Sequence, residues 1–71
     1  MIMDYSKLRG RIVEKFGSQK AFARILGVSN NSVTKKMTSK TSFNQKDIHL
    51  WCTLLGIPMD NVREYFFTLK V

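Results

Sequence analysis

A stretch of short polar side chains, residues 29–32, has the strongest binding chemistry in this sequence. Its two serines and two asparagines donate and accept hydrogen bonds but are weak helix formers. An asparagine side chain can bind adenine through two hydrogen bonds, which is worth about 1–3 kcal/mol of discrimination between bases. One such residue is enough to cap a helix, so four in a row favour a binding surface at a helix N-terminus. The expected base contacts are Ser29, Asn30, Asn31, Ser32, Thr34 and Lys35.

Positive charge is concentrated around this stretch. The 71 residues include 12 basic and five acidic ones, which gives a formal net charge of +7. No acidic residue lies between Glu14 and Asp47, whereas seven basic residues do. Such an asymmetry favours an anionic partner, which could be a phosphate backbone, an anionic membrane or an acidic protein surface. A solvated basic face without a specific partner is the alternative.

Phosphate contacts are expected to flank the residues that contact bases. Gln19 begins a predicted helix, where free backbone N–H groups and the helix dipole favour a phosphate. Lysines add an attraction that does not depend on base sequence, although each could equally be a solvated surface residue. The expected phosphate contacts are Gln19, Lys20, Lys36, Lys40 and Lys46.

The sequence lacks the residue groupings of an enzyme or a metalloprotein. It has no His/Asp/Glu cluster, glycine-rich phosphate loop or nucleophile–base pair, so we expect no catalysis and no cofactor. Cys52 is the one cysteine, and with His49 it supplies only two of the about four ligands of a zinc site. No apolar run approaches the roughly 20 residues of a membrane span, and no apolar signal segment follows Met1. We therefore expect a cytoplasmic protein without a membrane partner.

Apolar residues recur at helical rather than alternating spacing, which predicts an all-α domain. The first predicted helix runs from about Asp4 or Tyr5 to Phe16 and ends at Gly17. A second is expected over about residues 19–26. The inward face of this second helix should hold Phe22, Ala23, Ile25 and Leu26.

A connection of only three residues, 27–29, joins the second helix to a third, which runs from Asn30 to about Met37 or Thr38. Gly27 allows the backbone to turn with a positive φ, and a tight turn of this kind sets two helices at a steep angle. Val28 is the expected apolar plug of the turn and Ser29 the cap of the third helix. Ala23 provides the small side chain that a close helix crossing needs.

The fourth predicted helix begins after Asn44 and ends at Gly56. Phe43 and Ile48 stand at the two positions of a hydrophobic staple around its first turn. Trp51 lies on its apolar face. The aromatic residues expected in the core are Phe16, Phe22, Phe43 and Trp51.

A last short helix is expected from Pro58 through about Glu64. The tail that follows, residues 65–71, is rich in aromatic and β-prone residues and could continue the helix or end in an extended strand. A domain this small cannot bury all three aromatic side chains of residues 65–67, and we expect some of them to face a partner. The expected dimer or partner interface consists of Tyr65, Phe66 and Phe67.

The turn and the tail together resemble a known family. Residues 19–23, Gln-Lys-Ala-Phe-Ala, lead through Gly27-Val28-Ser29 to Val33, as in helix-turn-helix proteins of the temperate-phage Cro and repressor type. More particularly, nearly the whole chain resembles the small Cro-like or repression-modulating proteins of phages of Gram-positive hosts. In that group a five-helix domain ends in a segment like Ile57-Pro58 followed by Tyr65-Phe66-Phe67-Thr68.

The resemblance implies a compact, five-helix, lambda-repressor-like domain over residues 1–71, with a helix-turn-helix at about residues 19–38. It also implies that the third helix enters the major groove and that Gln19 contacts phosphate and braces that helix. Where this sequence has Lys36, the wider family often has an apolar residue, and Met37 can take the inward role here.

Two functions follow from the residues and the resemblance. The leading one is a sequence-specific, DNA-binding regulator of the Cro type, which would act as a homodimer on operator DNA in the nucleoid of a bacterial host during a lysis–lysogeny switch. The other is an antirepressor that binds a partner repressor protein and has weak or no specific DNA binding of its own. Charge alone would also allow RNA binding, but no aromatic platform interleaves with the basic stretch.

Overall fold

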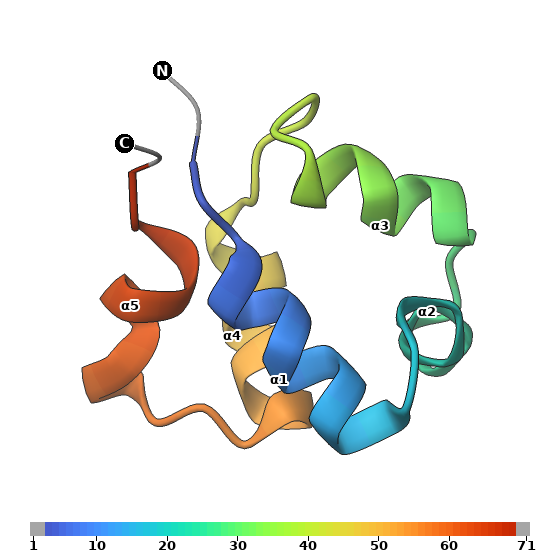
Figure 1. The fold of residues 1–71 in the computed structure, drawn as a ribbon, viewed down its shortest axis with the longest axis horizontal. Coiled ribbons are helices and arrows are strands. Elements are labelled where there is room, and N and C mark those ends of the chain that lie inside the picture. The colour runs from blue at the N-terminus through green and yellow to red at the C-terminus, as the bar shows by residue number, and fades with distance from the viewer. Residues whose placement is uncertain (1–2, 70–71) are drawn as a thin grey trace.

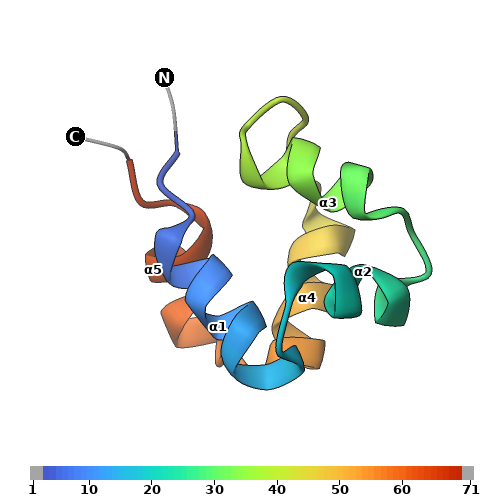
Figure 2. The same cartoon turned by 45° about the vertical axis from the view of Figure 1, so that its right-hand side comes forward.

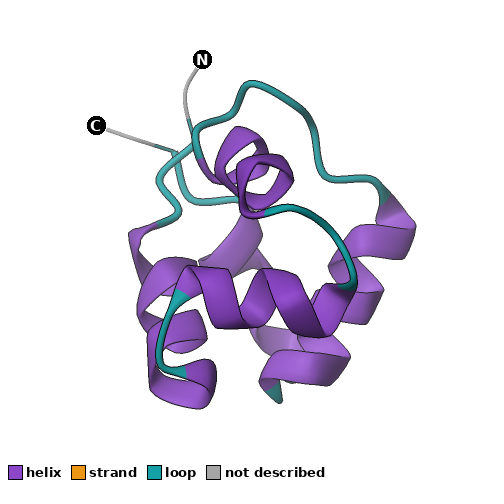
Figure 3. Cartoon of the chain, turned by 90° about the vertical axis from the view of Figure 1, so that its right-hand side faces the viewer, coloured by secondary structure: helices purple, strands orange, loops and turns teal. Residues whose placement is uncertain are grey.

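Five α-helices follow one another along residues 3–69, the part of the chain that the computed structural model describes. They are α1 (Ser6–Phe16), α2 (Gln19–Leu26), α3 (Asn30–Met37), α4 (Gln45–Leu55) and α5 (Val62–Phe66), and a short 3-10 helix, η1 (Met59–Asn61), precedes α5. Only helices and loops are drawn for these residues in Figure 3, and Met3 forms an isolated antiparallel bridge with Leu69. The prediction of an all-α, five-helix fold is confirmed.

The helices begin and end largely where local sequence chemistry places their boundaries. Three of them begin after a side chain that accepts a hydrogen bond from the backbone N–H three residues later, and these caps are Ser18, Ser29 and Asn44. Gly27 and Gly56 end α2 and α4 in the left-handed conformation, with φ of 77° and 66°. The first helix begins at Ser6, slightly later than predicted, and Tyr5 precedes it without a side-chain cap.

The end of the chain differs from the prediction of one helix beginning at Pro58. Pro58 precedes η1, and the α-helix that follows extends to Phe66. Beyond it, Leu69 forms the isolated bridge to Met3. Of the two alternatives for the tail, the helix therefore continues to Phe66, and no strand forms among the described residues that follow it. Residues 70–71 lie outside the described residues.

The two ends of the described chain lie side by side, away from α2 (Figures 1 and 2). The backbone N–H of Asp4 donates to the carbonyl of Thr68 over 2.7 Å. On the surface, Lys7 of α1 pairs with Glu64 of α5 at 2.6 Å. The hydrogen bond between these two side chains raises the pKa of Lys7 and lowers the pKa of Glu64. Both groups are exposed, so solvent limits what this pair adds to stability.

Trp51 of α4 is the centre of the core. Its ring packs edge-on against Phe22 of α2 at 4.9 Å between centroids and against Phe43 at 4.8 Å. Phe43 in turn contacts Phe66 of α5 at 5.1 Å. Edge-to-face contacts of this kind are favoured by the charge distribution of aromatic rings. Phe16 and Phe43, which were also expected in the core, are only partly buried and pack against it.

The prediction that Ile25 lies on the inward face of α2 is wrong, because its side chain is 57% exposed. Phe22 and Ala23 are buried and Leu26 is partly buried, so these three define the inward face. At 3.6 residues per turn, Ile25 lies roughly 100° from the centre of that face. The apolar plug expected at Val28 is also half exposed, at 47%.

The prediction that Phe66 belongs to an aromatic interface at the C-terminus is wrong, because this residue is only 2% exposed and belongs to the core. Tyr65 is partly buried and lies under the ammonium group of Lys7, 5.2 Å from its ring centre. Phe67 is 52% exposed. Of the three, Phe67 is therefore the one whose side chain is exposed to a partner.

Phe66→Ala is expected to lower the free energy of unfolding by about 3–5 kcal/mol, because it removes a buried ring and leaves a cavity. Urea denaturation followed by the fluorescence of the single tryptophan measures this change. Phe67→Ala is the matched control and should cost less than about 1 kcal/mol. Similar losses for the two variants would contradict the assignment of Phe66 to the core.

Candidate functional site

The connection between α2 and α3 holds the two helices steeply crossed. Figure 1 shows α2 nearly end-on while α3 lies across the view. The N–H of Val28 donates to the carbonyl of Ala23 over 3.1 Å, and that of Gly27 donates to Arg24 over 3.1 Å. Ala23 is 2% exposed, so a larger side chain there would meet packed neighbours. The expected tight turn is therefore present.

The outer face of α3 is polar. Val33 and Met37 are its two buried residues and determine its rotation about its own axis. Met37 therefore takes the inward role, as expected where the wider family has an apolar residue at the position of Lys36. The exposed residues of α3 are Asn30, Asn31, Ser32 and Lys35. Most of the predicted base-contact residues are therefore accessible to a partner.

Gln19 connects the start of α2 to α3 by two hydrogen bonds. Its side-chain amide donates to Asn30 Oδ1 over 3.1 Å and to Thr34 Oγ1 over 2.8 Å. Thr34 Oγ1 itself donates to the backbone carbonyl of Asn30 over 3.0 Å. The bracing role that the resemblance implied for Gln19 is thus visible in the geometry. Asn30 and Thr34 are partly engaged by it, whereas Asn31 makes no side-chain hydrogen bond with any described residue.

Ser29 and Ser32 chiefly complete the helix. Ser29 Oγ accepts the backbone N–H of Ser32 over 3.1 Å, and the two hydroxyl oxygens lie 3.0 Å apart. These contacts satisfy the groups that a helix N-terminus leaves free. The capping interpretation therefore accounts for two of the four polar residues at positions 29–32.

Lys36 is not placed like the other predicted phosphate contacts. It pairs with Asp47 of α4 at 2.7 Å and donates to the carbonyl of Ser42 over 3.2 Å. Its ammonium group lies 5.6 Å from the ring centre of Phe43, and its side chain is only 23% exposed. The sequence did contain an indication that Lys36 would be partly buried. Lys36 stands at a position where the wider family often has an apolar, inward residue. In contrast, the exposed lysines among the predicted contacts are Lys20, Lys40 and Lys46.

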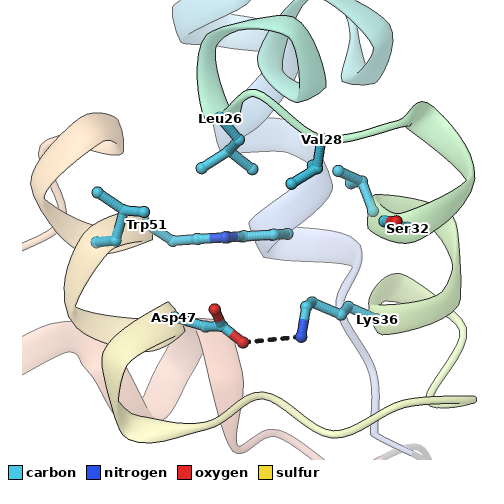
Figure 4. Close-up of a pocket in the computed structure, with 8 residues that line it drawn as sticks. Leu26, Val28, Ser32, Lys36, Asp47 and Trp51 are labelled. Atoms are coloured by element: carbon cyan, nitrogen blue, oxygen red, sulfur yellow. Dashed lines mark hydrogen bonds and ion pairs between the residues drawn. The ribbon is translucent and has the colours of Figure 1, made fainter.

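A groove that the sequence did not reveal lies between the α2–α3 connection and α4, with a volume of about 100 Å³ (Figure 4). The ion pair of Lys36 and Asp47 closes one side of it. We call it the Trp51 groove, and its apolar lining consists of Leu26, Val28, Val33, Leu50 and Trp51. Periodicity could not predict it, because the lining comes from three helices and a turn.

The remaining reactive side chains form no chemical site in the described chain. Burial raises the pKa of the Cys52 thiol, so this thiol stays protonated and unreactive at neutral pH. Within residues 3–69, no group of three or more His, Cys, Asp or Glu side chains could hold a metal ion. None of the helices in the same range is long and apolar enough to cross a membrane.

The chain belongs to a family described as proteins of unknown function, DUF739, whose model matches residues 1–69. Among solved structures, it is similar to the solution structure of the modulator of repression (MOR) of the temperate bacteriophage TP901-1 from Lactococcus lactis. The two are 35% identical, superpose with a TM-score of 0.85, and the match covers 100% of this chain and 96% of the other. No curated protein sequence matches significantly. The similarity supports a role as a small phage regulator.

Lys36→Ala is expected to lower the free energy of unfolding by about 1 kcal/mol, because it removes a half-buried ion pair and a cation–π contact. Lys35→Ala is the matched control on the exposed side of the same helix and should change stability by less than about 0.5 kcal/mol. Urea denaturation of both variants measures the difference. Equal stability of the two variants would mean that the Lys36–Asp47 pair does not persist in solution.

Proposed function

We propose that this protein modulates repression in a temperate phage by binding the phage repressor and changing its action on operator DNA. The observation that carries the proposal is the similarity to the modulator of repression of phage TP901-1, which extends over the whole chain at 35% identity. A shared domain alone would not be enough, because one fold can serve many functions.

The surface around α3 supports a protein partner. Several side chains that would serve a DNA reader are already used within the domain, since Gln19 holds Asn30 and Thr34 and Asp47 holds Lys36. Apolar side chains are exposed near these polar ones, with Val28 at 47%. Exposed apolar groups are stabilised by contact with another protein, whereas phosphates and sugars offer them little.

Such a modulator needs no catalytic chemistry. If it binds the repressor only when the repressor is free of DNA, mass action lowers the apparent affinity of the repressor for its operator. At a modulator concentration about 100 times the dissociation constant, that affinity falls by about 100-fold. If it binds the DNA-bound repressor better, the same linkage strengthens repression.

Specific DNA binding by the protein itself is the second candidate function, and one feature favours it. Asn31 and Lys35 are exposed on α3, and Lys20 is exposed on the first turn of α2. This is the arrangement in which a helix-turn-helix over about residues 19–38 places base and phosphate contacts on one side. A homodimer on a two-fold operator would be the expected form. The two functions are compatible, because the repressor could make weak DNA binding specific.

The first test is a titration of the purified protein into the repressor of the same phage, with and without its operator DNA. We expect a complex between the two proteins by size-exclusion chromatography and a changed operator affinity of the repressor in a gel-shift assay. The protein alone, added to the same operator, is the control. Absence of a protein complex at concentrations up to about 100 μM would refute the proposal.

The second test is selection on randomised duplex DNA at two salt concentrations. We expect weak, steeply salt-dependent binding without an enriched site, because lysines contact phosphates independently of sequence. Recovery of a two-fold site would instead favour the Cro-type function. In that case Asn31→Ala should relax the sequence preference while weak non-specific binding persists.

A further inference from the structure

We propose that the Trp51 groove receives one apolar side chain from an acidic helix of the partner repressor. This inference rests on the proposed function and identifies the part of the surface that makes the central contact. The apolar lining, the charge of the surrounding helices and the form of the rim support it independently.

The groove has a buried floor and an exposed mouth. Trp51 and Val33 form the floor and are 2% and 1% exposed, whereas Val28 and Leu50 are 47% and 46% exposed at its edges. Figure 4 shows the indole extending from α4, with Leu26 and Val28 on one side of it. Since the floor belongs to the core, the groove is fixed before any partner arrives, which reduces the entropy cost of binding.

The size of the groove selects the class of side chain that it can hold. Its volume is about 100 Å³. An apolar cavity of about 150 Å³ binds a benzene molecule, so the Trp51 groove suits one branched aliphatic side chain. Hot spots of protein interfaces are commonly single apolar anchors in such pockets, surrounded by groups that exclude water.

The charge of the helices that form the groove selects the surroundings of that side chain, because the two charged residues of the lining, Lys36 and Asp47, are paired with each other. The helices α2, α3 and α4 carry five basic residues and one acidic residue, Asp47. Asp47 is itself paired with Lys36 at 2.7 Å. Every other charged side chain on these helices is therefore positive, so the partner surface should carry carboxylates around its apolar anchor.

The rim distinguishes this partner from a nucleic acid. The Lys36–Asp47 pair lies on the opposite side of the indole from Leu26 and Val28 (Figure 4). An apolar centre with a polar rim is the usual form of a protein–protein interface. A phosphate backbone would attract the same lysines but would leave the groove unfilled, because its outer surface is polar. An acidic helix with a projecting aliphatic side chain satisfies both parts of the surface.

Two substitutions at the mouth of the groove, Val28→Lys and Leu50→Lys, test this inference in binding assays with the purified repressor. Each should weaken binding at least about tenfold, because a lysine side chain blocks the apolar site. The added positive charge would by itself favour an acidic partner, so charge cannot explain a loss. Met59→Lys is the matched control, because Met59 is 63% exposed and lies outside the groove, and it should change affinity less than about twofold. Thermal denaturation establishes that each variant is folded.

Charge reversal on the flanking helices tests the acidic character of the partner. Arg24→Glu and Lys35→Glu should each weaken repressor binding about fivefold and reduce its salt dependence, whereas Arg63→Glu on α5 should not. Unchanged or stronger binding by the first two variants would overturn the acidic helix as the occupant.

The outcomes separate this inference from the function on which it rests. If the repressor does not bind the wild-type protein, the proposed function fails and the groove inference fails with it. If the repressor binds the wild-type protein and both groove variants equally well, the proposed function stands and the groove inference alone is overturned.

Discussion

The packing of Trp51 against two phenylalanine rings is the constraint on which the rest of the structure depends. Phe22 and Phe43 meet the indole at interplanar angles of 86° and 87°. Edge-to-face contacts are favoured between aromatic rings, so the contact of Phe22 with Trp51 holds α2 against α4. A connection of only three residues then leaves α3 little freedom. The polar face of α3 and the Trp51 groove are therefore both consequences of how one indole ring is packed.

Features governed by neighbouring residues could be predicted from the sequence. The caps at Ser18, Ser29 and Asn44 and the glycine ends of α2 and α4 act within one helical turn, so local chemistry determines them. The brace formed by Gln19 was implied by family resemblance and not by spacing. A polar residue at the start of a helix has many compatible roles, and only its hydrogen bonds to Asn30 and Thr34 distinguish them.

Features governed by distant residues could not be predicted in this way. Lys36 and Asp47 are 11 positions apart, and each could have been a solvated charge. Similarly, periodicity cannot determine the rotation of a helix as short as α5, which has five residues. Packing against Phe43 selects Phe66 for the core and leaves Phe67 exposed. The prediction that Phe66 belongs to an interface was wrong for this reason, whereas an interface at Phe67 stays a prediction.

Net charge is a weak guide to the kind of partner, because an operator and an acidic protein surface attract the same lysines. The arrangement of uncharged groups separates the two. A DNA reader needs free hydrogen-bonding side chains over the bases, and α3 retains Asn31 in this state. A protein partner needs apolar surface beside the charge, and Val28 and Leu50 expose about half of theirs around a buried floor. The same basic face can thus attract either partner, but only a protein with a projecting apolar side chain uses the groove within it.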